Sequence, residues 1–356
     1  MDNTVFAGRR ERLRPFLREG GPSALLVTLD ADRFYLSGFE LHDAQINESS
    51  GCLLITADGR DLLCTDRRFA DAAARLWDEN DIVVYRGDGL KDINALLKDR
   101  VSGEVGFTPS ALSVEAFEVI GAGVRMRDAG NPVADLRIIK DDDEIGKLEN
   151  ACRLNRELMR KLPALARPGL TEAALAWEIE RFWRERGAEE LAFPSIVAVD
   201  GNAALPHAVP GHTEITDACC LLVDAGCRLD GYCSDQTRTL WIGDKPDALF
   251  TSDLQLVREA QERALRGIRP GMTAREVYGI AASFLEAAGV LNLFTHALGH
   301  GIGLQTHEAP SLNESSEVIL RPGMVLTVEP GLYRRGRYGI RWEHMALVTE
   351  DGARIL

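Results

Sequence analysis

Acidic residues in one segment have the spacing that places two carboxylates across a β-hairpin. The segment CCLLVDAGCRLDGYCSDQTRTLWI has strand-like ends around a turn signal at residues 228–231. Residues that face each other in an antiparallel pair have a constant index sum, and the sum for Asp224 and Asp235 centres on Leu229 and Asp230. We therefore predict that Asp224 stands directly opposite Asp235, with Cβ atoms about 5 Å apart.

A second segment, MVLTVEPGLYRRGRYGIRWEHMALV, repeats the arrangement with Glu329 and Glu343 centred on Gly336. Opposed like charges destabilise a strand pair, and burying them costs several kcal/mol each. Two divalent cations would balance four carboxylates, so this pattern favours a dinuclear metal site. The alternatives are solvated acids or ion pairs with Arg238 or Arg341, and a β-bulge would shift either register.

Histidines gather near the second hairpin. The stretch THALGHGIGLQTHEAP holds His296, His300 and His307, and its glycines favour an extended or looped backbone over a helix. His207 occupies the matching place in an earlier segment, after its own helix. We predict that all four histidines line one cleft.

The elements that carry these residues occur twice. RPGLTEAALAWEIERFWRERGA (167–188) and RPGMTAREVYGIAASFLEAAGV (269–290) align without a gap, each with a threonine N-cap and a glycine stop. A helix is expected before each (144–166 and 252–268), and a β-rich stretch after each. The sequence therefore predicts two related α+β halves around a pseudo-twofold axis.

The chain before Pro132 has a different pattern, typical of a modest α/β domain. Helices are expected over 67–79, 90–99 and 113–121. The strand candidates are ALLVTL, FYLSGF, CLLITA, IVVYR and EVGF. We expect domains over 1–132 and 133–356, with Asp141–Asp143 capping a long amphipathic helix after the boundary.

Composition limits the classes of function. Of 356 residues, 45% are apolar and 27% charged, and the net charge of −14 is spread over both parts without a basic stripe. Nucleic acid is therefore not an expected partner. No apolar run suits a signal peptide or membrane span, and seven cysteines without a CxxC pair favour a reducing cytoplasm.

From about residue 138 onward, the motifs VDAG, GYCSDQTRT, HALGHGIGLQTHE, VEPGLY and GIRWE resemble the pita-bread metallopeptidases, which include methionine aminopeptidase, prolidase and aminopeptidase P. Residues 5–131 resemble the N-terminal domain of prolidase, aminopeptidase P and creatinase, through RFYLSGF and the strand order. The resemblance implies an α/β N-terminal domain followed by a duplicated α+β pita-bread catalytic domain.

The resemblance also implies roles for individual residues. It implies two divalent ions, with manganese favoured over cobalt, zinc or iron, and with Asp235 and Glu343 bridging both ions. The implied metal ligands are Asp224, Asp235, His300, Glu329 and Glu343. The residues implied to act in catalysis or substrate binding are His207, His296, His307, Glu329, Tyr333 and Arg341. His344 stands where relatives commonly have aspartate, which bears on the tuning of the metal.

The expected function is a metal-dependent Xaa-Pro aminopeptidase. Prolidase activity is the alternative, and it would need a cation for the dipeptide carboxylate. Arg334, Arg335 and Arg337 cluster at a predicted hairpin tip, where we expect them to be solvated. More distant alternatives are a metal-free creatinase-like hydrolase and a non-catalytic peptide-binding protein. The implied partners are small peptides and a second copy of the chain in a homodimer, with no membrane.

Overall fold

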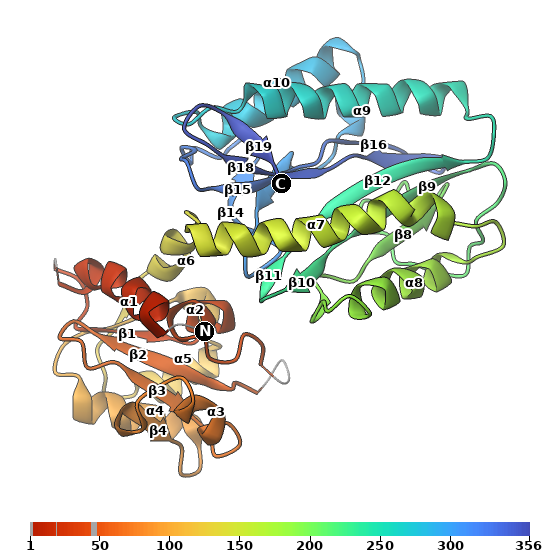
Figure 1. Cartoon of the computed structure of the whole chain (residues 1–356). Coiled ribbons are helices and arrows are strands. Elements are labelled where there is room, and N and C mark those ends of the chain that lie inside the picture. The colour runs from red at the N-terminus through yellow and green to blue at the C-terminus, as the bar shows by residue number, and fades with distance from the viewer. Residues whose placement is uncertain (1–2, 19, 44–47) are drawn as a thin grey trace. The chain divides into compact units, whose positions relative to one another are not determined.

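The computed structural model describes residues 3–18, 20–43 and 48–356 (Figure 1). The chain divides into two compact units, Met1–Arg137 and Ile138–Leu356. The predicted boundary falls at the start of helix α6 (Pro132–Arg137), inside the first unit. Among the described residues, no helix combines the length and the apolar character needed to cross a membrane.

The first unit is an α/β domain built on a six-stranded mixed sheet in the order β4-β3-β2-β1-β5-β6. Its strands are β1 (Ala24–Val27), β2 (Gly51–Thr56), β3 (Leu62–Thr65), β4 (Ile82–Val84), β5 (Val105–Phe107) and β6 (Met126–Asp128). Its other helices are α1 (Asn3–Arg18), α2 (Asp30–Ser37), α3 (Ala70–Ala74), α4 (Gly89–Arg100) and α5 (Val114–Gly121), with 3₁₀ helices η1 (Glu79–Asp81) and η2 (Pro109–Ala111).

The prediction of a strand over FYLSGF is wrong, because most of this segment belongs to helix α2. The aromatic and apolar residues of this segment suit a strand. However, residues typical of a helix start precede them, and a glycine typical of a helix end follows Ser37. Asp30 and Asp32 lie in the first turn, where acidic groups stabilise the helix dipole, and Gly38 ends the helix with a left-handed φ of 73°. Tyr35 and Leu36 are fully buried from this helix, so tertiary packing supports it.

The second unit contains the duplicated elements. Its helices are α7 (Asp142–Leu165), α8 (Glu172–Arg184), α9 (Ala248–Gly267) and α10 (Ala274–Ala287), with the 3₁₀ helix η3 (Leu291–Leu293). Strands of its first half are β7 (Glu190–Leu191), β8 (Ile196–Val199), β9 (Cys219–Ala225), β10 (Cys227–Leu229), β11 (Tyr232–Cys233) and β12 (Gln236–Ile242). Strands of its second half are β13 (Gly299–Gly301), β14 (Glu308–Leu312), β15 (Val325–Val328), β16 (Gly331–Arg334), β17 (Tyr338–Arg341), β18 (His344–Val348) and β19 (Ala353–Ile355).

Helix pairs sandwich the strands of this unit, with α7 beside α8 and α9 beside α10 (Figure 1). Asp141 caps α7 in a capping box with Glu144, as the acidic run predicts. One apolar core joins α7 and α8 to β8 and β9, and a larger one joins α9 and α10 to β14, β15 and β18. The site-bearing strands therefore lie between two packed layers of helices.

Matching backbone contacts show the internal duplication directly. The Gly169 N–H donates to the Ile215 carbonyl, and the Gly271 N–H donates to the Leu320 carbonyl in the same way. Ile215 and Leu320 each return a bond to the loop before the next helix. The N-cap residues Thr171 and Thr273 form isolated β-bridges to Glu214 and Ile319, the residues just before Ile215 and Leu320. In each repeat, the loop before the second helix is thus hydrogen-bonded to the segment that leads into the sheet of the same half. This matching arrangement supports the predicted two-half architecture.

Candidate metal centre

The first acidic pair lies on the hairpin of β9 and β12. Asp224 faces Thr237 in this hairpin, so the prediction that it stands directly opposite Asp235 is wrong by two residues. Asp230 and Gly231 both have positive φ (53° and 81°), and this two-residue turn moves the hairpin centre forward by one residue. Since strand side chains alternate, Asp235 stays on the face of Asp224, and both line one pocket.

The second acidic pair has the predicted register. Val328 of β15 faces His344 of β18, and Gly331 of β16 faces Arg341 of β17, so both ladders share the index sum of Glu329 and Glu343. The two glutamates lie between these ladders. The prediction for this hairpin is confirmed, and its turn contains Gly336 with a left-handed φ of 72°.

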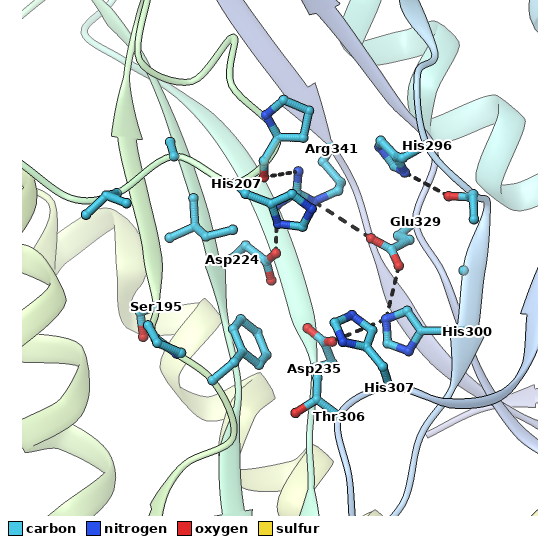
Figure 2. A pocket seen from close by; sticks show the side chains of 18 of the residues that line it. Ser195, His207, Asp224, Asp235, His296, His300, Thr306, His307, Glu329 and Arg341 are labelled. Carbon is cyan, nitrogen blue, oxygen red and sulfur yellow. Dashed lines mark hydrogen bonds and ion pairs between the residues drawn. The ribbon is translucent and has the colours of Figure 1, made fainter. Parts of the chain in front are cut away.

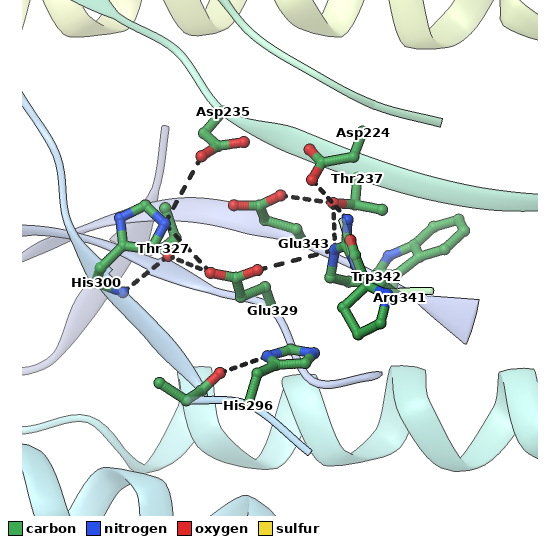
Figure 3. Close-up of polar contacts among 12 residues, drawn as sticks. Asp224, Asp235, Thr237, His296, His300, Thr327, Glu329, Arg341, Trp342 and Glu343 are labelled. Atoms are coloured by element: carbon green, nitrogen blue, oxygen red, sulfur yellow. Dashed lines mark hydrogen bonds and ion pairs between the residues drawn. The ribbon is translucent and has the colours of Figure 1, made fainter. Parts of the chain in front are cut away.

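Three of the acids, Asp235, Glu329 and Glu343, lie near the imidazole of His300 on β13, and Asp224 lies beside Arg341 (Figure 3). His300 Nε2 is 3.3 Å from Glu329 Oε1 and 3.7 Å from Asp235 Oδ2. Ligand atoms of Asp235, His300 and Glu343 all lie within 4.8 Å of one another. This spacing allows one cation to contact all three groups.

Three carboxylate oxygens in this cluster are buried without a hydrogen-bond partner among the described residues: Asp224 Oδ1, Asp235 Oδ1 and Glu343 Oε1. Buried anionic oxygens are normally paired or bound to a metal, because desolvation without compensation is costly. Four carboxylates and one imidazole, without a thiolate, form a donor set that suits Mn, Fe, Co or Zn. The residues present therefore fit divalent cations.

His300 is oriented for such a role. Its Nδ1 is 3.0 Å from the backbone oxygen of Gly301, which can only accept, so Nδ1 carries a proton. Nε2 consequently points at the acids. A backbone carbonyl that fixes the ring in this way is the common support of metal-binding histidines.

Without cations, the cluster retains protons. Burial raises the pKa of Asp235 and Glu343 well above their usual range, and repulsion from the neighbouring acids adds to the shift. Burial also favours neutral Glu329, but its hydrogen bond to charged His300 outweighs this and lowers its pKa to about 2. Burial lowers the pKa of His300, whereas contact with Glu329 reverses the shift and raises it.

Arg341 connects the acids to the pocket wall. Its Nη2 donates to Asp224 Oδ2 at 2.6 Å, and its Nη1 donates to the Tyr333 hydroxyl at 2.5 Å. Its Nε donates to Thr237 Oγ1 at 3.1 Å. Of the two ion-pair alternatives, Arg341 therefore neutralises Asp224, and its Nε also lies 3.9 Å from Glu329 Oε2. Among the described residues, no arginine forms an ion pair with Asp235 or Glu343.

His296 is held by the same network. Its Nδ1 lies 2.7 Å from the Ala297 carbonyl, so this nitrogen is protonated and Nε2 accepts from the Tyr333 hydroxyl at 3.0 Å. Both ring nitrogens are thus used within the protein. Tyr333 lies behind Arg341 and is not among the residues that line the pocket.

The site opens into a cavity of about 620 Å³ (Figure 2). The predicted convergence of four histidines is confirmed, because His207, His296, His300 and His307 all line it. His207 and His307 have no hydrogen-bond partner among the described residues, and the His307 ring packs edge-on against His300 at 4.3 Å. The apolar wall consists of Phe193, Pro194, Ile196, Pro206, Ala208, Val209 and Pro210.

The arginines of the second hairpin tip do not line this cavity. Arg334 forms an ion pair with Asp253 of α9 at 2.5 Å, so the expectation that it is solvated is wrong. Arg335 and Arg337 are exposed. The pairing follows from the packing of β16 beside α9, which brings Asp253 under the hairpin.

Two threonines that sequence reasoning did not assign also support the acids. Thr237 Oγ1 donates to Glu343 Oε2 at 2.8 Å, and Thr327 Oγ1 donates to Glu329 Oε1 at 3.1 Å. Thr327 Oγ1 also accepts from the His300 N–H at 3.0 Å. Each threonine lies two residues from an acid on its own segment, so the two-residue period of strands is the signal that finds them.

A third overlooked residue is Glu172, at the start of α8. Its fully buried carboxylate accepts from the backbone N–H groups of Val199 and Gly211 at 2.7 and 2.8 Å, and from the Asn202 side chain. These bonds fix the loop that carries His207. The sequence shows Glu172 only as a residue of a first helical turn, so its tertiary partners carry no local signal.

Comparison with known proteins is consistent with this site. The model of "Metallopeptidase family M24" matches residues 146–350, and that of "Creatinase/Prolidase N-terminal domain" matches residues 9–139. The Xaa-Pro dipeptidase of Pyrococcus furiosus is 30% identical over 349 residues, spanning 98% of this chain and 97% of the relative.

Solved structures extend the comparison to three dimensions. An Xaa-Pro dipeptidase from Bacillus anthracis superposes with a TM-score of 0.91 at 31% identity, covering 98% of this chain and 97% of the other. An X-Pro aminopeptidase from Thermotoga maritima superposes with a TM-score of 0.84 at 30% identity, with the same coverage.

Proposed function

The chain belongs to metallopeptidase family M24, with a creatinase-type N-terminal domain and a pita-bread catalytic unit, and on this premise we propose that it is a dinuclear metal-dependent Xaa-Pro dipeptidase. This proposal replaces the aminopeptidase expected from the sequence. It is supported by relatives named Xaa-Pro dipeptidase, which match the whole chain and superpose with the higher of the two TM-scores.

The observation that carries the proposal is the set of three unpartnered buried carboxylate oxygens beside His300. Two divalent ions, manganese being the first candidate, would be held by Asp224, Asp235, His300, Glu329 and Glu343. When bound, such ions supply Lewis-acid activation of a peptide carbonyl and of water.

The chain's own residues would handle protons and orientation. Glu329 lines the pocket and is ionised at neutral pH, so its carboxylate can take a proton from water and pass it to the leaving nitrogen. A proline nitrogen leaves from a tertiary amide and requires that proton. His207 and His307 have free donors for the substrate, including the dipeptide carboxylate. His296, with both nitrogens engaged, would act through Tyr333.

Peptide length tests the proposal. We expect Ala-Pro to be hydrolysed at least about tenfold more efficiently than Ala-Pro-Ala, because a dipeptidase uses the carboxylate that the longer peptide displaces; tenfold corresponds to about 1.4 kcal/mol. The measurement is kcat/KM for both peptides with metal content determined on the same preparation. Ala-Ala serves as the control for the requirement for proline.

Other outcomes would assign a different function. Preference for Ala-Pro-Ala would restore the aminopeptidase. Hydrolysis that persists without metal would indicate a creatinase-like mechanism, and a metal-loaded protein that leaves every Xaa-Pro peptide intact would overturn the proposal. A Glu329→Gln preparation shows whether any activity comes from a contaminating peptidase.

Glu172→Gln should reduce kcat/KM for Ala-Pro by about tenfold, with the loss in KM and with unchanged metal content. The amide nitrogen cannot accept the N–H of Val199 or Gly211, and an unsatisfied buried donor costs about 1–3 kcal/mol. The loop that carries His207 would loosen as a result. Glu178→Gln, at a partly exposed residue of α8 that pairs with Arg181, is the matched control. Normal KM in Glu172→Gln would contradict the role of this loop.

The proposal includes a reducing cytoplasm as the compartment and a homodimer as the assembly. The seven cysteines support the compartment, because all of them are free and buried. Size-exclusion chromatography with light scattering tests the homodimer, and a monomeric mass would exclude it.

A further inference from the structure

A partly buried polar cluster lies behind Glu343, outside the pocket. It consists of Arg238 on β12, Gln261 on α9 and His344 at the start of β18. Gln261 is 2% exposed, and none of the three lines the cavity. The cluster connects β12, α9 and β18 directly after Glu343, one of the proposed metal ligands.

Hydrogen bonds in this cluster fix the protonation state of His344. Arg238 Nη2 lies 2.8 Å from His344 Nε2, and a guanidinium can only donate, so Nε2 is the acceptor. His344 Nδ1 lies 3.1 Å from Gln261 Oε1 and must be the donor. The amide orientation of Gln261 is settled because its Nε2 donates to the carbonyls of Val328 and Trp342. His344 is therefore the neutral tautomer with its proton on Nδ1.

Arg238 transmits this arrangement to the site. Its Nη1 donates to the Glu343 carbonyl at 2.6 Å and to the Thr237 carbonyl at 2.7 Å. Thr237 in turn bonds both ends of Glu343, since its carbonyl accepts the Glu343 N–H and its hydroxyl donates to Glu343 Oε2. The Arg238 guanidinium thus fixes the backbone of Glu343. It also fixes the backbone of Thr237, whose hydroxyl orients the Glu343 carboxylate.

The charge of Arg238 is also unusual. It stacks on the Trp342 ring at 4.4 Å, with Arg258 near the same ring at 4.9 Å. Among the described residues no carboxylate forms an ion pair with it, and its side-chain acceptor is the neutral imidazole. A partly buried cation without an ion-pair partner among the described residues therefore lies directly behind a site of four acids, where it offsets part of their negative charge.

We propose that His344 is a positioning residue: in its neutral Nδ1–H form it holds Arg238 against the backbone of Glu343 and so sets the affinity of the metal site. The inference rests on the proposed metal-binding function. It concerns residues that touch neither substrate nor ion. Loss of groups that orient metal ligands typically costs 10- to 100-fold in metal affinity.

Two substitutions separate positioning from simple packing. His344→Leu removes the acceptor for Arg238 and the donor for Gln261, and we expect Mn²⁺ affinity to fall about 10- to 100-fold. His344→Gln keeps one acceptor, one donor and no charge, and we expect affinity within about threefold of wild type. His212→Leu, at an exposed histidine outside the pocket, is the matched control. Affinities are measured by competition between the protein and a fluorescent chelator.

A second measurement observes the His344 ring in the wild-type protein directly. Nitrogen-15 NMR of histidine-labelled wild type should show the His344 ring as the Nδ1–H tautomer, assigned by the signal missing in His344→Gln. Unchanged affinity in His344→Leu, equal loss in His344→Gln, or an Nε2–H or doubly protonated ring would overturn this inference while leaving the proposed function intact. A wild type that binds no Mn²⁺ would overturn both.

Discussion

Removing divalent ions should abolish hydrolysis of Ala-Pro and should lower the Tm of the protein by at least about 5 °C. A ligand that binds only the folded state, at a hundred times its Kd, adds about 2.7 kcal/mol to the free energy of unfolding. For a unit of about 150–250 residues, each kcal/mol moves the Tm by about 2–4 °C. Scanning fluorimetry with and without a chelator measures the shift.

The structural cause is the set of acids that lack partners. Asp224 Oδ1, Asp235 Oδ1 and Glu343 Oε1 are buried with no hydrogen-bond partner among the described residues, so the metal-free fold bears their desolvation. Bound cations would remove this cost and the mutual repulsion of the acids. Adding Mn²⁺ after chelation should restore both the Tm and the activity, and metal analysis should find two ions per chain. Equal Tm values with and without chelator would contradict the site.

The substitution Asp235→Asn should reduce kcat/KM by at least about 1,000-fold and should make the metal-free protein more stable than metal-free wild type. Metal activation contributes several kcal/mol to the rate, and each 1.36 kcal/mol is a factor of ten. An amide carries no charge, so the burial and the repulsion from Glu343 that raise the pKa of Asp235 no longer act. The two effects have opposite signs, which a general loss of folding would not produce.

The stability difference should depend on pH. Because the pKa of Asp235 is raised in the folded state, that state binds the proton more tightly than the unfolded chain. Metal-free wild type therefore loses stability as pH rises from the unfolded pKa near 3.9 towards the folded value. Asparagine does not titrate, so the Tm advantage of the variant should grow as pH rises above the unfolded pKa towards the raised folded pKa of Asp235.

Asp230→Asn provides the control for this experiment. It makes the same chemical change in the same hairpin, at an exposed turn residue with φ of 53° that asparagine also tolerates. We expect wild-type activity, metal content and pH dependence. Retained metal in Asp235→Asn, or a metal-free variant less stable than metal-free wild type, would show that Asp235 is not part of a repelling cluster.

The sequence was sufficient to find the acids and one of the two registers. Glu329 and Glu343 are centred on Gly336, and the structure places the turn there because only that position takes a left-handed φ. The first hairpin was predicted to centre on Leu229 and Asp230, whereas the structure centres it on Asp230 and Gly231. An Asp-Gly pair is the stronger hairpin signal, so this error was avoidable.

Other features depend on tertiary contacts that leave no local pattern. Two arginines were equal candidates to neutralise the acids, yet Arg341 turns to Asp224 whereas Arg238 turns to the Glu343 carbonyl and His344. The use of both His296 nitrogens within the protein is likewise set by Tyr333 and by its own loop. Spacing in the sequence finds residue types on a face, but the partner of each depends on packing between distant strands.

The starts of helices α8 and α10, which occupy matching places in the two repeats, differ in what they bind. Glu172 follows the N-cap of α8 and ties down the His207 loop, while the aligned position of the second repeat is Ala274, which cannot bind anything in this way. There Glu276 merely closes a capping box. Aligned helix starts therefore have different roles: one holds the loop that carries His207, and the other only caps its own helix. Neither half alone contains all four acids and all four histidines, so a change in the packing of either half would alter the whole site.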